Sequence, residues 1–276
     1  ASQTVASSTF SEKTDEAESP TGARIAPPAD ASVYYDPLSY STYDNPYELY
    51  KTLREKAPVY YNERRKLWVV SRYEDVSAIF DNHEQFSNHL GNDMDGTHDS
   101  YAGGILVAVD PPRHTGLRQS VRRVFALREL LAREEGLRAL AQQLLADLQS
   151  RGGGDFASEI ALPLAIGTGV KLVGLPEGDE QLLQDHLLRS MERTIGAFGV
   201  PEDAAASNQE EEVHLNALIE ARAAELAGGA DSNVNDVLTQ ILLASEKGKI
   251  DESDNIGIAH LILSASIDAP GALLTN

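Results

Sequence analysis

From about Pro111 onward, apolar residues recur every three to four positions, and this spacing predicts a succession of helices. Polar stretches rich in Gly and Pro interrupt the pattern, among them "RGGGD", "LPEGD" and "FGVPED". The predicted helices cover residues 112–126, 129–150, 156–174, 179–198, 208–228, 233–246 and 252–275. No repeat of fixed period is present, which disfavours a helical-repeat array and leaves a simple bundle as the other alternative.

The pattern before Pro111 is mixed. Residues 45–46, Asn and Pro, suit the start of a helix that Pro58 ends. Two short β-type runs, Val59–Tyr61 and Leu67–Val70, flank a polar connection and predict a hairpin. A short helix is predicted next, with Val76, Ile79 and Phe80 on its apolar face. The predicted fold class is therefore mainly α with a small N-terminal β-sheet.

Two segments lack such patterns. Residues 1–30 are rich in Ser, Thr, Glu, Ala and Pro, and we expect a disordered lead-in followed by a single domain over 31–276. Residues 82–104 are polar and contain Gly, which predicts a long loop of the functional or mobile kind. His and Asp residues crowd this loop, but their spacing matches no standard ligand pattern, so we expect no metal site there.

Composition narrows the class of protein. The net charge of −20 over 276 residues argues against nucleic acid as a partner. The sequence contains no cysteine, which excludes disulfides, cysteine-ligated metals and a thiol nucleophile within these residues. The most apolar segment, Ile256–Leu274, is interrupted by His260, Asp268 and Pro270, and is more typical of a core helix than of a membrane span. With no secretory signal pattern at the start, we expect a cytoplasmic protein that is not bound to a membrane.

The first candidate site is "VDPPRHTGLRQSVRRVF", residues 109–125. Asp110 is a suitable N-cap for a helix that begins at the prolines. His114 and Arg118 then lie four residues apart on one face, and an imidazole with a guanidinium suits a carboxylate or a phosphate. A solvated polar face is the alternative interpretation.

Arginine is dense over residues 113–138, which hold seven Arg and three Glu, a local balance of +4. On an acidic chain this contrast indicates a basic face. It fits a docking surface for an acidic protein partner, and it fits an exposed amphipathic helix without a partner equally well.

The second candidate site is "ILSASIDAPGALL", residues 262–274, where Asp268 stands in an apolar helical run. A carboxylate there is costly unless it is paired, hydrated or functional, and a buried Asp that binds a backbone N–H is one interpretation. Pro270 has no N–H, so the carbonyl of Ser266 loses its helical partner. We expect a polar notch that holds a small molecule such as water or dioxygen.

In their order along the chain, these segments resemble the N-terminal two-thirds of a bacterial cytochrome P-450, the heme-thiolate monooxygenase family. "DPPRHTGLRQSVRRVFALREL" resembles the family's helix that binds the heme propionates, and "NPYELYKTLREKAPVYY" resembles its N-terminal helix and first strand. The segment from "NDVLTQILLASEKG" to the final "GALLTN" is similar to the long helix on the distal, oxygen-side face of the heme. The resemblance implies a cytochrome P-450-like fold, truncated after that helix, and heme b as the cofactor.

The resemblance also implies roles for single residues. His114 and Arg118 would bind a heme propionate, while Ala265 and Ser266 would line the distal pocket. Ala265 and Ala269 would border the substrate, a small organic molecule. Asp268 would be the catalytic acid that relays protons during oxygen activation.

The sequence departs from the family at two places. Ala269 replaces the usual Thr. Either Ser266 with water or a hydroxyl of the substrate would supply the missing group, or oxygen activation would be poorly coupled. The family's later Glu-x-x-Arg helix has no counterpart, because the Glu135–Arg138 match precedes the distal helix, and the cysteine that ligates the iron is absent. We therefore expect that these residues alone form no normal heme-thiolate centre.

The leading functional hypothesis is a portion of a monooxygenase that inserts one atom of O2 into its substrate. Its electrons would come from an acidic ferredoxin-type partner at the Arg-rich face 113–138. The alternative is a degenerate, non-catalytic family member that binds or scaffolds. An unrelated all-α ligand-binding module is a third reading, which the ordered resemblance disfavours.

Overall fold

The computed structural model describes residues 33–91, 94, 105–194, 197 and 199–275. The predicted disordered lead-in, 1–30, lies outside these residues, as does most of the loop 82–104. Contacts divide the chain into two compact units, residues 1–82 with 193–199, and residues 83–192 with 200–276.

The first unit contains the predicted hairpin. Its elements are α1 (Tyr40–Asp44), α2 (Tyr47–Lys56), β1 (Val59–Asn62), β2 (Leu67–Val70) and α3 (Tyr73–Phe80). The strands are antiparallel, with Val59 opposite Val70 and Tyr61 opposite Trp68. Two details differ from the sequence predictions. Pro46, and not Asn45, is the N-cap of α2. Phe80 is 81% exposed, whereas its spacing predicts a place on the apolar face of α3.

A buried ion pair joins the hairpin to residues 35–38, which precede α1. Asp36 is 2% exposed, and its carboxylate accepts from Arg65 Nε at 3.0 and 3.1 Å and from the Leu38 backbone N–H at 3.0 Å. Asn62 donates to the Tyr35 carbonyl and accepts from the Arg65 N–H. Because Arg65 lies in the turn of the hairpin, these bonds position the turn against residues 35–38.

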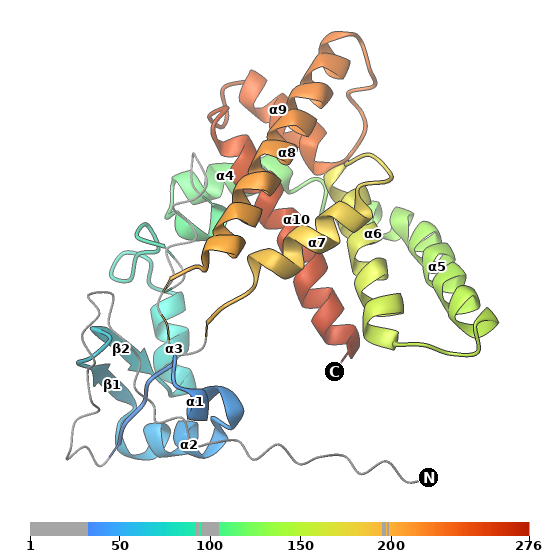
Figure 1. The fold of residues 1–276 in the computed structure, drawn as a ribbon. Coiled ribbons are helices and arrows are strands. Elements are labelled where there is room, and N and C mark those ends of the chain that lie inside the picture. Colours follow the sequence, from blue (N-terminus) through green and yellow to red (C-terminus); the bar gives the residue numbers. More distant parts are fainter. Residues whose placement is uncertain (1–32, 92–93, 95–104, 195–196, 198, 276) are drawn as a thin grey trace, which may run out of the picture. The chain divides into compact units, whose positions relative to one another are not determined.

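The second unit is helical. Its elements are η2 (Leu106–Ala108), α4 (Arg113–Val121), α5 (Leu127–Ser150), a π-helical turn η3 (Ala157–Ala161), α6 (Leu162–Val173), α7 (Glu180–Ser190), α8 (Glu202–Ala227), α9 (Val237–Glu246) and α10 (Asp254–Thr275). The predicted fold class, mainly α with a small sheet, is confirmed (Figure 1). The ends of several helices differ: α4 ends at Val121, before the predicted 126, and α8 begins at Glu202, before the predicted 208.

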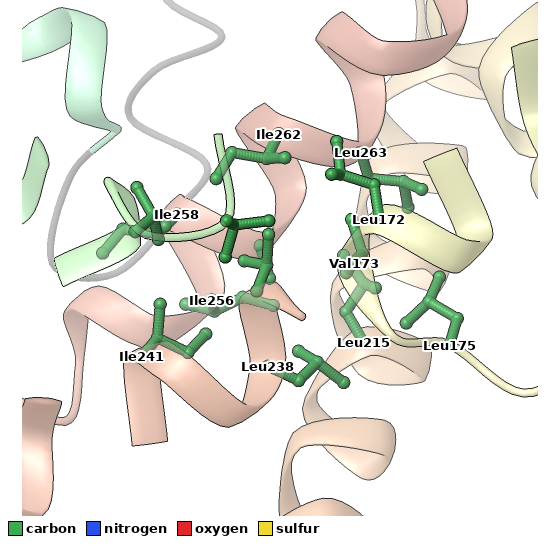
Figure 2. Packing of buried hydrophobic residues seen from close by; sticks show 14 of the residues in the cluster. Leu172, Val173, Leu175, Leu215, Leu238, Ile241, Ile256, Ile258, Ile262 and Leu263 are labelled. Atoms are coloured by element: carbon green, nitrogen blue, oxygen red, sulfur yellow. The ribbon is translucent and has the colours of Figure 1, made fainter. Parts of the chain in front are cut away.

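The core of this unit is built around α10, which lies beside α6 (Figure 1). Figure 2 shows aliphatic side chains that meet from α6, the residues after it, α8, α9 and α10. They include Leu172, Val173, Leu175, Leu215, Leu238, Ile241, Ile256, Ile258, Ile262 and Leu263. The close approach depends on Gly169 of α6, where an added Cβ would lie 3.1 Å from Ile267 Cγ1.

Candidate functional site: two helices of a predicted heme pocket

The start of α4 differs from its prediction. The N-cap is Pro112, without a side-chain hydrogen bond. The carboxylate of Asp110 instead accepts from the Ser87 hydroxyl and, at 3.1 Å, from the Asn88 backbone N–H. These two bonds, the hydroxyl first, lower the pKa of Asp110. Asp110 therefore anchors the beginning of the loop after α3 to the approach to α4, a role that its position in the sequence did not reveal.

His114 and Arg118 occupy consecutive turns of α4, as predicted. His114 is half-buried and Arg118 is exposed. Within the part of the chain that the structure describes, neither side chain is engaged in a hydrogen bond or an ion pair. The two cationic or donor groups are thus available on one face for an anionic group.

An ion pair that the sequence did not predict joins α4 to α10. Arg113 Nη2 binds the carboxylate of Asp254, which is buried at the start of α10, while the other oxygen accepts from the Asp251 backbone N–H at 3.0 Å. Asp268 lies 14 residues further along α10, which corresponds to about 21 Å of helix. The pair thus joins the first candidate segment to the first turn of α10, the helix that also carries Asp268.

The two faces of α10 differ in burial. Ile262, Leu263 and Ile267 are buried against the core, whereas Ala265, Asp268 and Ala269 are exposed. The interpretation of Asp268 as a buried structural residue is therefore wrong. The proposed relay role of Asp268 stays a prediction, and so do the pocket roles of Ala265 and Ala269.

Ser266 lies toward α6. Its hydroxyl donates to the Ile262 carbonyl at 2.6 Å, and its Cβ would lie 3.5 Å from a Cβ placed on Gly169. The helix continues through Pro270 to Thr275. Pro270 has no N–H to donate to the Ser266 carbonyl. Ser266 and Asp268 are two residues apart and so project from different sides of the helix.

α10 is also long and apolar enough to cross a membrane, as judged by length and composition alone. It is the only such helix among the described residues. Its ten buried residues, from Asp254 to Gly271, pack within the second unit, as those of a core helix do.

A buried acid and a partly buried base meet between α8 and α10. Glu211 Oε1 lies 2.9 Å from His260 Nδ1, and the two side chains are 7% and 16% exposed. The residues are 49 positions apart, so no local pattern could reveal the pair. Glu211 by itself has no feature that separates it from the other acids of α8.

The Arg-rich segment 113–138 is only partly free. Arg133 donates to the backbone carbonyls of Val124 and Asn235, and Arg138 pairs with Glu134 at 2.8 Å. The exposed members that remain are Arg118, Arg122, Arg123 and Arg128. The sequence predicted no metal site in the loop 82–104. Its described residues, His83 and His89 among them, belong to no group of three metal-ligating side chains, and His98 lies outside the described residues.

The residues present fit a heme in two respects. α4 offers His114 and Arg118 as donors for a carboxylate, and the exposed side of α10 offers the small side chains Ala265 and Ala269, which leave room for a flat group. The 276 residues include no cysteine, so the iron thiolate is not among the groups that they supply.

The fold is that of part of a cytochrome P450. The bacillaene polyketide synthase cytochrome P450 PksS of Bacillus subtilis 168 superposes with a TM-score of 0.67 at 21% identity, over 85% of this chain and 58% of PksS. CalO2 gives a TM-score of 0.67 at 21% identity, over 85% of this chain and 59% of CalO2.

The relatives in sequence are also cytochrome P450s. A putative cytochrome P450 123 of Mycobacterium tuberculosis H37Rv is 29% identical over 252 residues, which are 90% of this chain and 61% of the relative. The cyclomarin C epoxidase CymV of Salinispora arenicola is 26% identical over 231 residues, 82% of this chain and 57% of CymV. No family model matches the chain. The resemblance to cytochrome P450s is confirmed, and the chain spans about 60% of the length of the relatives that it matches.

Proposed function

We propose that these residues form the N-terminal portion of a heme-thiolate monooxygenase, which inserts one atom of O2 into a small organic substrate. The observation that carries the proposal is the unengaged pair His114 and Arg118 on α4, in a fold shared with cytochrome P450s. When bound, heme b would supply the redox chemistry of oxygen activation.

In this proposal each helix has its own task. His114 and Arg118 donate to a propionate and so hold the group in place by charge-assisted bonds. Ala265 and Ala269 have small side chains, which leaves room for the substrate beside α10 on the oxygen side. Asp268 holds a proton on its carboxyl group and releases it toward the reacting oxygen.

The test compares the full-length protein product of the reading frame that contains residues 1–276 with the 276-residue chain itself. We expect the full product to bind heme and to give a thiolate-type spectrum when reduced and treated with carbon monoxide. The shorter chain should not give this spectrum. A full product without heme would support the alternative, a non-catalytic binding or scaffolding protein.

Loss of the arginine on α4 should weaken heme retention. We expect Arg118→Ala in the full product to retain heme about 10-fold less tightly, since a charge-assisted bond contributes about 1.5 kcal/mol or more. Heme transfer to apomyoglobin measures the retention. Arg54→Ala, an exposed arginine of α2, is the matched control. Equal heme retention in both variants would support the alternative interpretation, in which Arg118 is part of a solvated polar face.

For the electron donor we propose an acidic ferredoxin-type protein at the exposed arginines of the segment 113–138. The local positive charge on a chain of net −20 supports it. Docking of this kind weakens steeply with salt. A Michaelis constant for ferredoxin that does not change with ionic strength would count against this face.

A further inference from the structure

Arg113, the first residue of α4, is bonded to a second helix. Its Nη2 donates to the carboxylate of Asp254, which is 1% exposed in the first turn of α10. The other oxygen of that carboxylate accepts from the Asp251 backbone N–H at 3.0 Å. Each oxygen of Asp254 thus has its own donor, and this fixes the orientation of the carboxylate and the place where the guanidinium binds it.

The neighbouring inward contacts of α4 are apolar. Leu117 and Val121 follow Arg113 at intervals of four residues, and the three form an inward row. Both aliphatic side chains, 2% and 3% exposed, belong to the core, and α4 packs there against α9 and η2. Apolar burial is non-directional, whereas a charged hydrogen bond is directional. The bond from Arg113 therefore defines the rotation of α4 about its axis more sharply than the two aliphatic residues do.

This rotation decides where His114 and Arg118 point. They follow the first two members of the inward row by one position, so they lie about 100° further around the helix. Side chains end about 6 Å from a helix axis, so a rotation of about 20° would move their donor groups by about 2 Å. Such a shift separates a donor from an acceptor at hydrogen-bond distance.

We propose that the ion pair of Arg113 and Asp254 positions α4 for heme binding. It sets the rotation at which His114 and Arg118 donate to a propionate. It also holds α4 to α10, the helix that the proposed function places on the oxygen side of the heme. Arg113 and Asp254 are positioning residues, because they act through the donors on α4. The inference rests on the proposed function.

The test is a double-mutant cycle in the full product, measured by heme transfer to apomyoglobin. We expect Arg113→Met and Arg118→Ala each to weaken heme retention about 10-fold. In the Arg113→Met protein, Arg118→Ala should cost less than about 2-fold more, because its guanidinium is already displaced from the propionate. Independent effects, about 100-fold together, would overturn the proposal, since a change that only destabilises the fold adds to the loss of Arg118.

Arg222→Met is the matched control. It also takes an arginine from a buried carboxylate, that of Asp236, but between α8 and α9. This change should lower the free energy of unfolding, yet Arg118→Ala should keep its effect of about 10-fold in the Arg222→Met protein. Loss of the Arg118 effect in the control as well would overturn the proposal, because the coupling would then reflect a general loosening.

A second variant covers the case in which Arg113→Met does not fold. Arg113→Met with Asp254→Asn leaves no unpaired buried charge and keeps an acceptor for the Asp251 N–H. We expect this protein to fold and to show the same loss of coupling with Arg118→Ala. Wild-type heme retention in it would overturn the proposal.

Hydrogen exchange of the α4 amides in the 276-residue chain needs no heme. A basic residue in the first turn opposes the helix dipole, so local effects alone would make exchange slower after loss of Arg113. We expect exchange about 10-fold faster in Arg113→Met, because the bond to α10 is lost. Unchanged or slower exchange would overturn the positioning role. Failure of the proposed function is distinguishable, since the wild-type full product would then lack heme while the exchange result stands.

Discussion

Asp236 shows how much of the second unit depends on single polar side chains. One carboxylate oxygen accepts from the Thr239 backbone N–H at 2.7 Å and caps α9, while the other binds Arg222 Nη1 at 2.7 Å. Arg222 also donates to the Gly174 carbonyl at the end of α6. One buried carboxylate thus joins α6, α8 and α9. Neither feature was predicted: the expected helix 233–246 places Asp236 inside it, and the partner Arg222 is 14 residues away.

We expect Asp236→Ala to lower the free energy of unfolding by about 3 kcal/mol. The change removes a helix cap, at about 1 kcal/mol, and the partner of a largely buried guanidinium. Asp236→Asn keeps an acceptor for Thr239 and should lose less. Urea unfolding of the three proteins measures this, and equal stability of Ala and Asn variants would contradict the role of the charge.

The hydrogen bonds to Asp110 are expected to depend on pH, which is a second prediction about a single residue. Hydrogen bonds from Ser87 and Asn88 hold the pKa of its carboxyl below the usual 3.8. Because the pKa of Asp110 is lowered in the folded state, these bonds contribute fully to the free energy of unfolding above pH 3.8. That contribution is lost as the pH falls through the pKa of the folded state. The Asn88 amide shift in NMR should therefore change below pH 3.8. It should show no such step in Asp110→Asn.

At the scale of the element, α10 combines a core helix with an interior proline. Its apolar spacing made the helix predictable, and Pro270 could be expected to disturb it. The structure keeps the helix intact to Thr275, because Ile267 and Gly271 on the buried side still pack in the core. Tertiary packing of that side thus outweighs the local cost of proline.

Replacing the proline should stabilise this helix. Pro270 is exposed, so Pro270→Ala loses little packing and gives the Ser266 carbonyl an N–H partner. We expect a gain of about 1–3 kcal/mol in the free energy of unfolding. Pro201→Ala, at the N-cap of α8, is the control and should change little. A Pro270→Ala protein that is less stable than the wild type would mean that the proline relieves a strain within α10.

At the scale of the whole molecule, exposed leucines stand out. α5 has no buried residue, and Leu127, Leu130, Leu131, Leu137 and Leu145 are exposed along it. An apolar surface of this kind favours self-association when nothing covers it.

We expect the 276-residue chain to self-associate less when Leu127 and Leu131, 72% and 59% exposed, become Glu and Gln. The first change also places an acid in the first turn of α5, where the helix dipole favours it. Light scattering at equal concentration measures the effect. Gln142→Glu with Gln143→Glu, two exposed sites, adds charge without removing apolar surface and should help less.

The sequence by itself determined most of the long helices and the place of the hairpin, because apolar spacing and Gly and Pro breaks act over a few residues. It missed the short α1, Tyr40–Asp44. It also identified His114 and Arg118 as one pair, since four-residue spacing puts them on one face. Helix ends were less predictable: Asp110 has the side chain of a cap, but its carboxylate bonds to Ser87 and Asn88 instead.

Only the tertiary structure decided which distant groups meet. Arg113 with Asp254 and Glu211 with His260 are 141 and 49 residues apart, and nothing local marks either pair. The same holds for burial: the sequence left open whether Asp268 is buried, and the residue lies on the exposed side of α10. The reason is physical, since periodicity describes one helix, whereas the side of it that is covered depends on what packs against it.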